Sequence, residues 1–320
     1  MPRGTDEPSA GSRALPLWLT AALVTGTFLA LALFERRRPL RRAVESGLQR
    51  TGRNLAIAAL GAIAVQVAEM PVASRAAAAV ERRGWGLVKR LALPVWLEVP
   101  LALLLLDYTL YVWHVLTHRV PVLWRFHAVH HIDLDLDAST AVRFHFGELT
   151  LSTPWRVAQV LLIGASPLTL SIWQTGLLMS ILFHHSNVQL PISVERRIGR
   201  VFVTPRMHGI HHSQVRDETD SNWSSGLTLW DWLHGTLRLN VPQRAITIGV
   251  PAFQDPADVT LAKMIALPFE PQRRYWVAPD GHTPAPRRQS ADAPALAPGQ
   301  HVPDELPRAR HRTVAPGSGT

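Results

Sequence analysis

The chain has 320 residues, of which 47% are hydrophobic and only 18% are charged, with a formal net charge of +9. Globular domains average about 25% charged residues, so this deficit argues against a free-standing soluble enzyme and against a largely disordered chain. The absence of cysteine excludes disulfide scaffolds, thiolate iron–sulfur sites and catalytic thiols. No stripe of basic residues recurs along the chain, and nucleic acid is therefore not an expected partner.

Four apolar stretches are long enough to enter a bilayer as helices. They cover residues 15–34, 54–73, 91–113 and 157–183. The last is too long for one straight crossing and contains Gly164 and Pro167 near its middle, which predicts two helices joined there. The sequence therefore predicts an all-α integral membrane helical bundle with about four spanning helices and a cytoplasmic, histidine-rich helical cap.

The distribution of basic residues indicates how the chain is oriented in the membrane. Its composition indicates where the regions of the chain begin and end. Seven arginines separate the first two stretches, against five lysines and arginines between the second and third. Since basic residues gather in cytoplasmic loops, everything after His114 is expected in the cytoplasm. We expect a disordered N-terminus (1–14), two membrane helices with their connecting loops (15–90), a catalytic region of membrane helices and cap (91–270), and a disordered Pro- and Arg-rich tail (271–320).

The histidines are clustered, because eleven of fifteen fall between His114 and His212. Three compact groups carry spacings of three and four residues, which place imidazoles on one face of a helix. The groups are His114 and His118; His127, His130 and His131; and His208, His211 and His212. A lone histidine is usually an ordinary packed residue, but eight in such groups beside apolar helices indicate a metal site.

The number of histidines bears on the kind of metal site. Eight exceed the needs of one mononuclear site, so two ions are implied. A structural zinc site is normally closed by four ligands, often with Cys, and the HExxH string of zinc peptidases is absent. Bis-histidine haem needs paired axial ligands rather than groups of three. A dinuclear iron centre that activates O2 in an apolar setting fits the pattern best.

Four polar side chains are expected to support these histidines. Asp107 shares a helix face with His114, and metal-bound imidazoles usually donate their second N–H to a carboxylate or carbonyl. Asp231 is expected to play the same supporting role for the last histidine group. Arg143 and Glu148 are expected to form an ion pair beneath the site.

Seven strings carry a resemblance to a known family. They are LLLDYTLYVWH (104–114), PVLWRFHAVHH (121–131), RFHFGE (143–148), FHHSNV (183–188), TPRMHGIHHS (204–213), DSNW (220–223) and WDWLHGT (230–236). Through them the chain resembles, from about residue 85 to residue 269, the sterol desaturase/fatty acid hydroxylase superfamily of integral membrane di-iron oxygenases. The resemblance implies as metal ligands His114, His118, His127, His130, His131, His145, His185, His208, His211 and His212. His184 lies outside that pattern.

The resemblance also implies an activity. It is O2-dependent hydroxylation or desaturation of a lipid C–H bond, in a sterol or fatty acyl chain, at two iron ions that zinc can replace on overexpression. The substrate would come from the bilayer, and electrons from an external donor such as a ferredoxin or a cytochrome b-type protein. The expected location is the bacterial inner membrane, with the active site and C-terminus cytoplasmic. A haem electron carrier, a metal transporter and a non-catalytic zinc-bearing relative stay open as alternatives.

Overall fold

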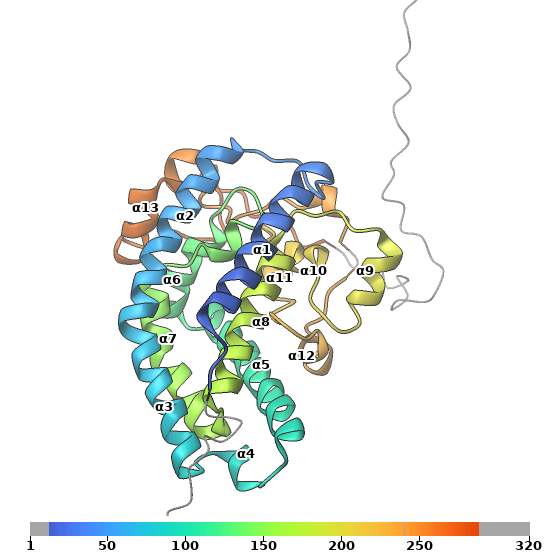
Figure 1. Cartoon of the computed structure of the whole chain (residues 1–320). Coiled ribbons are helices and arrows are strands. Elements are labelled where there is room, and N and C mark those ends of the chain that lie inside the picture. Colours follow the sequence, from blue (N-terminus) through green and yellow to red (C-terminus); the bar gives the residue numbers. More distant parts are fainter. Residues whose placement is uncertain (1–12, 240, 288–320) are drawn as a thin grey trace, which may run out of the picture. The chain divides into compact units, whose positions relative to one another are not determined.

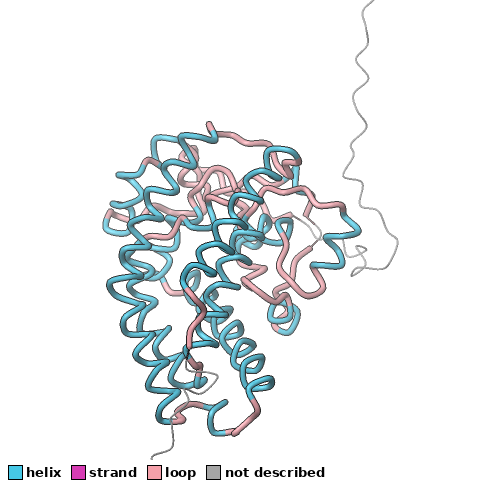
Figure 2. The backbone as a smooth tube through the Cα atoms, viewed as in Figure 1, coloured by secondary structure: helices cyan, strands magenta, loops and turns pink. Residues whose placement is uncertain are grey.

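The computed structural model describes residues 13–239 and 241–287, and in these residues the regular structure is helical (Figure 2). Pairing between extended segments is limited there to three isolated bridges, such as the one between Pro39 and Val188. The predicted all-α class is therefore confirmed. The expected disorder of residues 1–12 and 288–320 concerns segments that lie outside the described residues.

Three segments of the described chain are long and apolar enough to cross a membrane. They are Leu17–Arg37, Gly47–Arg90 and Val95–Arg119. The first is helix α1 and the last is α5. The middle segment is built from α2 (Gly47–Ala64), a π-helical turn (Val65–Glu69), α3 (Met70–Arg83) and α4 (Leu87–Arg90). The integral membrane class is thus supported with three candidate spans, and a fourth span stays a prediction.

The long apolar run of residues 157–183 is divided as its glycine and proline predicted. Helix α7 (Phe146–Gln159) runs through a π-helical turn to Gly164, and α8 (Pro167–His185) begins three residues later. At the break, a Cβ on Gly86 would lie 2.3 Å from the Cα of Gly164, and both residues have positive φ. The two glycines therefore allow the loop after α3 to touch the junction between α7 and α8.

Helices α1 and α8 pack side by side and run in the same direction (Figure 1). Near their starts, Leu15 N donates to Ser171 Oγ at 2.9 Å; at their ends, Asn187 N donates to Glu35 Oε1 at 2.7 Å. The arginines that follow α1 consequently lie at the end of the bundle where α8 reaches its terminal histidines. On the other side of the bundle, α2 packs against α7.

The cap consists of short helices joined by long loops. These are α6 (Pro121–His131), α9 (Ile192–Ile198), α10 (Pro205–His211), α11 (Arg216–Thr219), α12 (Leu229–Leu233) and α13 (Leu261–Ala266). One apolar core of the cap joins Trp124 and Val129 of α6 to Phe253 and Met264. Because α6 follows α5 after a single residue, this core fixes α6 directly at the end of a spanning helix.

The chain stays packed beyond the predicted start of the tail at residue 271. Tyr275 and Trp276 pack against the cap core, and Ala252 N donates to Tyr275 O at 3.1 Å. Arg287 forms an ion pair with the buried Glu218. The boundary at residue 271 was therefore placed too early, because two aromatic residues in a Pro- and Arg-rich stretch contribute to the core.

A buried ion-pair network ties α2 to the loop after α6. Asp133 Oδ2 accepts from Arg50 Nη2 at 2.8 Å and from Asn54 Nδ2 at 3.0 Å, while its Oδ1 lies 3.1 Å from Arg143 Nη1. Burial opposes ionisation of Asp133, but the two guanidinium charges outweigh it and hold the pKa of that carboxyl well below its usual range. The expected ion pair between Arg143 and Glu148 is wrong, because Arg143 pairs with Asp133 instead.

Candidate metal centre

Two groups of four histidines form where α5, α6, α8 and α10 meet. In each group the candidate ligand atoms all lie within 4.8 Å of one another. The first group is His114, His118, His127 and His131; the second is His130, His185, His208 and His212. A third grouping, His131 with His211 and His212, links the two. Eight of these nine were expected from the compact groups, and His185 from the resemblance.

The second group has the donor spacing that one shared ion requires. His185 Nε2 lies 2.9 Å from His130 Nε2 and 3.0 Å from His208 Nε2, and His208 Nε2 lies 3.1 Å from His212 Nε2. Two nitrogens bound at about 2.1 Å to one ion, at right angles to each other, lie about 3 Å apart. Four buried imidazoles facing one another cannot all hydrogen-bond among themselves, since each neutral ring has a single N–H. A bound cation satisfies all of them.

Several outer ring nitrogens are held by hydrogen bonds to protein oxygens. Nδ1 of His114 donates to Trp223 O at 2.6 Å, and Nδ1 of His211 donates to Ser221 O at 2.8 Å. Since a carbonyl oxygen only accepts, these bonds fix the tautomer and leave Nε2 free of a proton.

Four Nε2 atoms belong to three rings of the first group and to His211, whose ring centroid lies 4.7 Å from that of His114. Those of His118, His127, His131 and His211 are buried without a hydrogen-bond partner. Buried polar atoms without partners are rare in proteins, so this set of four needs an explanation. These four unpaired nitrogens point to a bound metal ion. The carbonyl oxygens that fix the tautomers of His114 and His211 would then lie outside the ligand set, as is usual at metal sites.

The electrostatics of the cap favour neutral rings. Burial, followed by the neighbouring histidines, lowers the pKa of His130, His131, His208 and His212 well below the ordinary value. Burial also lowers the pKa of His211 to about 3. The rings are consequently unprotonated at neutral pH, which is the form that binds metal.

Two further histidines, His145 and His184, differ from the sequence-based expectation in their surroundings. His145 lies outside the groups at the start of α7, where its Nδ1 accepts from Gly147 N at 2.9 Å and its Nε2 faces Ile265 O at 3.3 Å. Both nitrogens are occupied by backbone, so His145 does not join the candidate ligands. His184, which the resemblance left out, is buried with its ring centroid 4.2 Å from that of His208.

The supporting carboxylates differ from expectation. Asp107 accepts from Leu227 N at 3.0 Å and Trp230 Nε1 at 2.7 Å, because its side chain faces the loop before α12. Within the described residues, no hydrogen bond joins Asp107 to a histidine. Asp231 accepts from Trp223 N at 2.8 Å and so positions the residue whose carbonyl binds His114. Glu148 is the carboxylate in direct contact with a candidate ligand, since its Oε1 lies 2.9 Å from His127 Nδ1.

The HGIHH string of α10 also depends on contact with the segment after α1. A Cβ on Gly209 would lie 2.3 Å from Arg41 Nη1, so only glycine leaves room for that side chain. Arg41 is buried there and donates to Gln243 Oε1 at 2.6 Å. The basic segment that follows α1 is thereby anchored beside the second histidine group.

These features define a helical membrane protein with a histidine-lined candidate metal centre at the end of its candidate spanning helices. Residues 99–236, which include every histidine of both groups, match the sequence model of the fatty acid hydroxylase family. Ornithine lipid hydroxylase OlsE of Rhizobium tropici is 31% identical over 249 residues, covering 73% of this chain and 71% of that protein. The chain belongs to the fatty acid hydroxylase family and is an oxidoreductase, as the resemblance implied.

Other relatives match over a shorter part of the chain. Cholesterol 25-hydroxylase of Rattus norvegicus is 32% identical over 147 residues, 44% of this chain and 47% of that protein. Alkylglycerol monooxygenase of Homo sapiens is 29% identical over 138 residues, 42% of this chain and 29% of that protein. The chain thus spans less than half the length of these two relatives. No solved structure matches the chain.

Proposed function

We propose that this protein is a membrane-bound di-iron enzyme that hydroxylates a C–H bond of a bilayer lipid with O2. The observation that carries the proposal is the division of the histidines into two groups of four. Each group is sufficient for one ion, and His211 and His212 connect them. The alternative of a haem carrier is disfavoured, because a haem would need two opposed axial ligands and room between them.

Iron is proposed for both sites because of the donor chemistry. Each site offers imidazole nitrogens with no thiolate, and imidazole suits iron as well as zinc and copper. Zinc is expected to replace iron on overexpression, since the same nitrogens bind it. The reduced di-iron pair would supply the O2 activation that an unactivated C–H bond requires.

The overall reaction consumes one O2, two electrons and two protons. One oxygen atom enters the C–H bond as a hydroxyl group and the other leaves as water. The chain itself contributes the fixed ring orientations, through Glu148 at His127 and the carbonyls at His114 and His211. Trp223, buried among these rings, helps to keep water from the site. The described residues include no cysteine, so the electrons are proposed to come from a separate donor such as a ferredoxin or a cytochrome b-type protein.

A lipid substrate is proposed because the centre is attached to the spanning helices. His114 and His118 lie in the last turns of α5, which is itself a candidate span. The names of the relatives support hydroxylation rather than desaturation, as they describe hydroxylases and a monooxygenase of an ornithine lipid, cholesterol and alkylglycerols. The proposed target is a C–H bond of a sterol or a fatty acyl chain.

We further propose that the centre faces the cytoplasm, across a bacterial inner membrane. The arginine-rich segment after α1 lies on the cap, where Arg41 contacts α10 and Arg50 contacts the loop after α6. Five of the seven basic residues between the first two spans follow one another closely at residues 36–42. Basic residues near span ends favour the cytoplasmic side.

The test begins with protein purified from iron-supplemented cells and measured for metal by mass spectrometry. It is reconstituted anaerobically with Fe(II), given bilayer lipids and a reducing system, and exposed to ¹⁸O2. The expected result is two irons per chain and a lipid product carrying one ¹⁸O atom. His208→Ala should lower the iron content by about one ion per chain and abolish the labelled product. A Soret band, or iron-loaded protein that consumes no O2 with any lipid extract, would contradict the proposal.

A further inference from the structure

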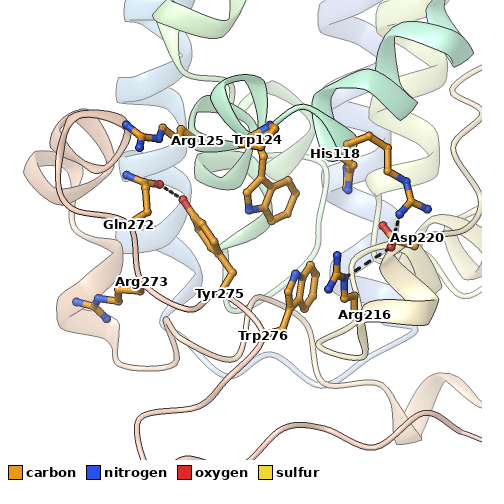
Figure 3. Close-up of a pocket in the computed structure, with 11 residues that line it drawn as sticks. His118, Trp124, Arg125, Arg216, Asp220, Gln272, Arg273, Tyr275 and Trp276 are labelled. Carbon is orange, nitrogen blue, oxygen red and sulfur yellow. Dashed lines mark hydrogen bonds and ion pairs between the residues drawn. The ribbon is translucent and has the colours of Figure 1, made fainter.

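A cavity of about 410 Å³ opens on the cap beside the first histidine group (Figure 3). His118 lines one part of it, and the ring centroid of Trp124 lies 4.8 Å from that of His118. The volume is within the range of sites that hold small molecules, about 300–1,000 Å³. Since the candidate metal ligand His118 forms part of its wall, a molecule bound in this cavity lies beside the first histidine group.

Aromatic rings form one wall of the cavity. Trp276 stacks on Trp124 with centroids 5.9 Å apart, and Tyr275 meets Trp124 edge-on at 5.6 Å. Figure 3 shows these three rings around the cavity, with His118 beside them. Trp124 also contacts His131, at 5.5 Å between centroids. An apolar chain lying across the two indoles is therefore directed towards the histidines.

The rim of the cavity is strongly basic. Four arginines line it against a single carboxylate, that of Asp220; they are Arg119, Arg125, Arg216 and Arg273. Asp220 pairs with Arg119 at 3.1 Å and Arg216 at 3.8 Å, and Arg273 pairs with Asp258 outside the lining. Arg125 is exposed. The cavity thus keeps an excess of positive charge after its ion pairs are counted, and guanidinium groups suit phosphates and carboxylates.

We propose that this cavity binds the anionic group of the lipid substrate, a phosphate or a carboxylate, so that the hydrocarbon part passes Trp124 towards the metal centre. The inference rests on the proposed function and adds the substrate class, an anionic lipid. The cavity offers a complementary surface to both parts of such a lipid. The arginines of the rim suit its anionic group, and the two indole rings suit its hydrocarbon chain. A free inorganic anion would use only the rim.

The test measures binding rather than turnover, and it uses the metal-free full-length chain in dodecyl maltoside micelles. Isothermal titration with dodecyl phosphate is compared with titration with inorganic phosphate and with dodecanol. The expected result is saturable binding of about one dodecyl phosphate per chain, weakened by added salt, with much weaker binding of the other two. Equal binding of inorganic phosphate would mean that the site takes a free anion, and would overturn the proposal.

Two variants with opposite expected effects make the assignment specific. Arg125→Gln combined with Arg216→Gln removes two rim charges, and about a tenfold loss of dodecyl phosphate affinity is expected. Asp220→Asn removes the single lining carboxylate and frees two arginines, so affinity should rise several-fold. Arg200→Gln, an exposed arginine that does not line the cavity, is the matched control and should leave the affinity unchanged.

The remaining outcomes separate this inference from the proposed function. Unchanged dodecyl phosphate binding in the double arginine variant would overturn the inference even if the loaded enzyme hydroxylates lipid. If that variant keeps lipid binding but loses electron transfer from an acidic donor protein, the rim is a donor-docking surface and the inference is wrong. Anion binding that persists in a chain without hydroxylase activity would leave the cavity assignment intact while the proposed function fails.

Discussion

Nδ1 of His127 and Oε1 of Glu148 lie 2.9 Å apart, between side chains that are only 3% and 7% exposed. This contact joins α6 to the first turn of α7 across the base of the first histidine group. It turns Nε2 of His127 towards His114 and His118, where it has no other partner. A carboxylate in this position holds the orientation of the ring it supports.

Replacing this carboxylate should weaken metal binding without unfolding the chain. For Glu148→Ala we expect metal affinity to fall by about 10- to 100-fold, as for other carboxylates that support a ligating histidine. Glu148→Gln should lose less, because its amide oxygen still accepts from Nδ1. Competition with a chelator, read as metal retained per chain, measures the change. Glu195→Gln is the matched control, since Glu195 is also buried but pairs with Arg206 instead; equal loss there would show that the effect is not local.

Substitution should distinguish a histidine of the candidate groups from His145, which lies outside them. His130→Ala removes a ring whose Nε2 lies 2.9 Å from that of His185, so it should lower the metal content by about one ion per chain and abolish turnover. His145→Asn keeps an acceptor for Gly147 N and should retain both metal and turnover, at a stability cost of about 1 kcal/mol. Metal analysis of the two purified variants decides. Loss of an ion in His145→Asn would return His145 to the ligand set.

Asp107 should prove structural rather than a support for histidine. Asp107→Ala leaves Leu227 N and Trp230 Nε1 without their acceptor. Because both hydrogen bonds are only partly buried, we expect about 1–3 kcal/mol of destabilisation in total. The measurement is the thermal melting temperature in detergent beside the metal content, which should stay at the wild-type level. A fall in metal content at unchanged melting temperature would instead place Asp107 in support of the metal centre.

The buried network around Asp133 should contribute more to stability than its neighbour Asp135. Asp133→Asn leaves Arg50 and Arg143 buried with no full counter-charge from that residue, which typically costs about 3–5 kcal/mol. Asp135→Asn is the matched control, because within the described residues the hydrogen-bond donors to the Asp135 carboxylate are the backbone amides of Val44 and Glu45. The Asp135→Asn substitution should lower the free energy of unfolding by about 1 kcal/mol. Thermal melting of both variants tests this order, and equal shifts would contradict it.

Much of the fold follows from the sequence alone. Three of the four apolar stretches coincide with the candidate spans, since about twenty residues without charge have few other stable environments. Gly164 and Pro167 predicted the break between α7 and α8, because both residues disfavour a continuous helix and glycine accepts the positive φ found there. The histidine spacings predicted eight of the nine histidines that come together in the candidate groups, since residues three and four apart share one helix face.

The division of the histidines into two groups depends on how the helices pack. His130 and His131 are neighbours in sequence, yet one belongs to the second group and the other to the first, because adjacent residues on a helix point in different directions. Spacing within one helix says nothing about which rings lie opposite on α5, α8 and α10. For the same reason, Glu148 rather than Asp107 supports a ligand, and His145 is turned away to cap α7. The sequence determined which side chains can bind metal; the packing of distant helices determined which of them meet.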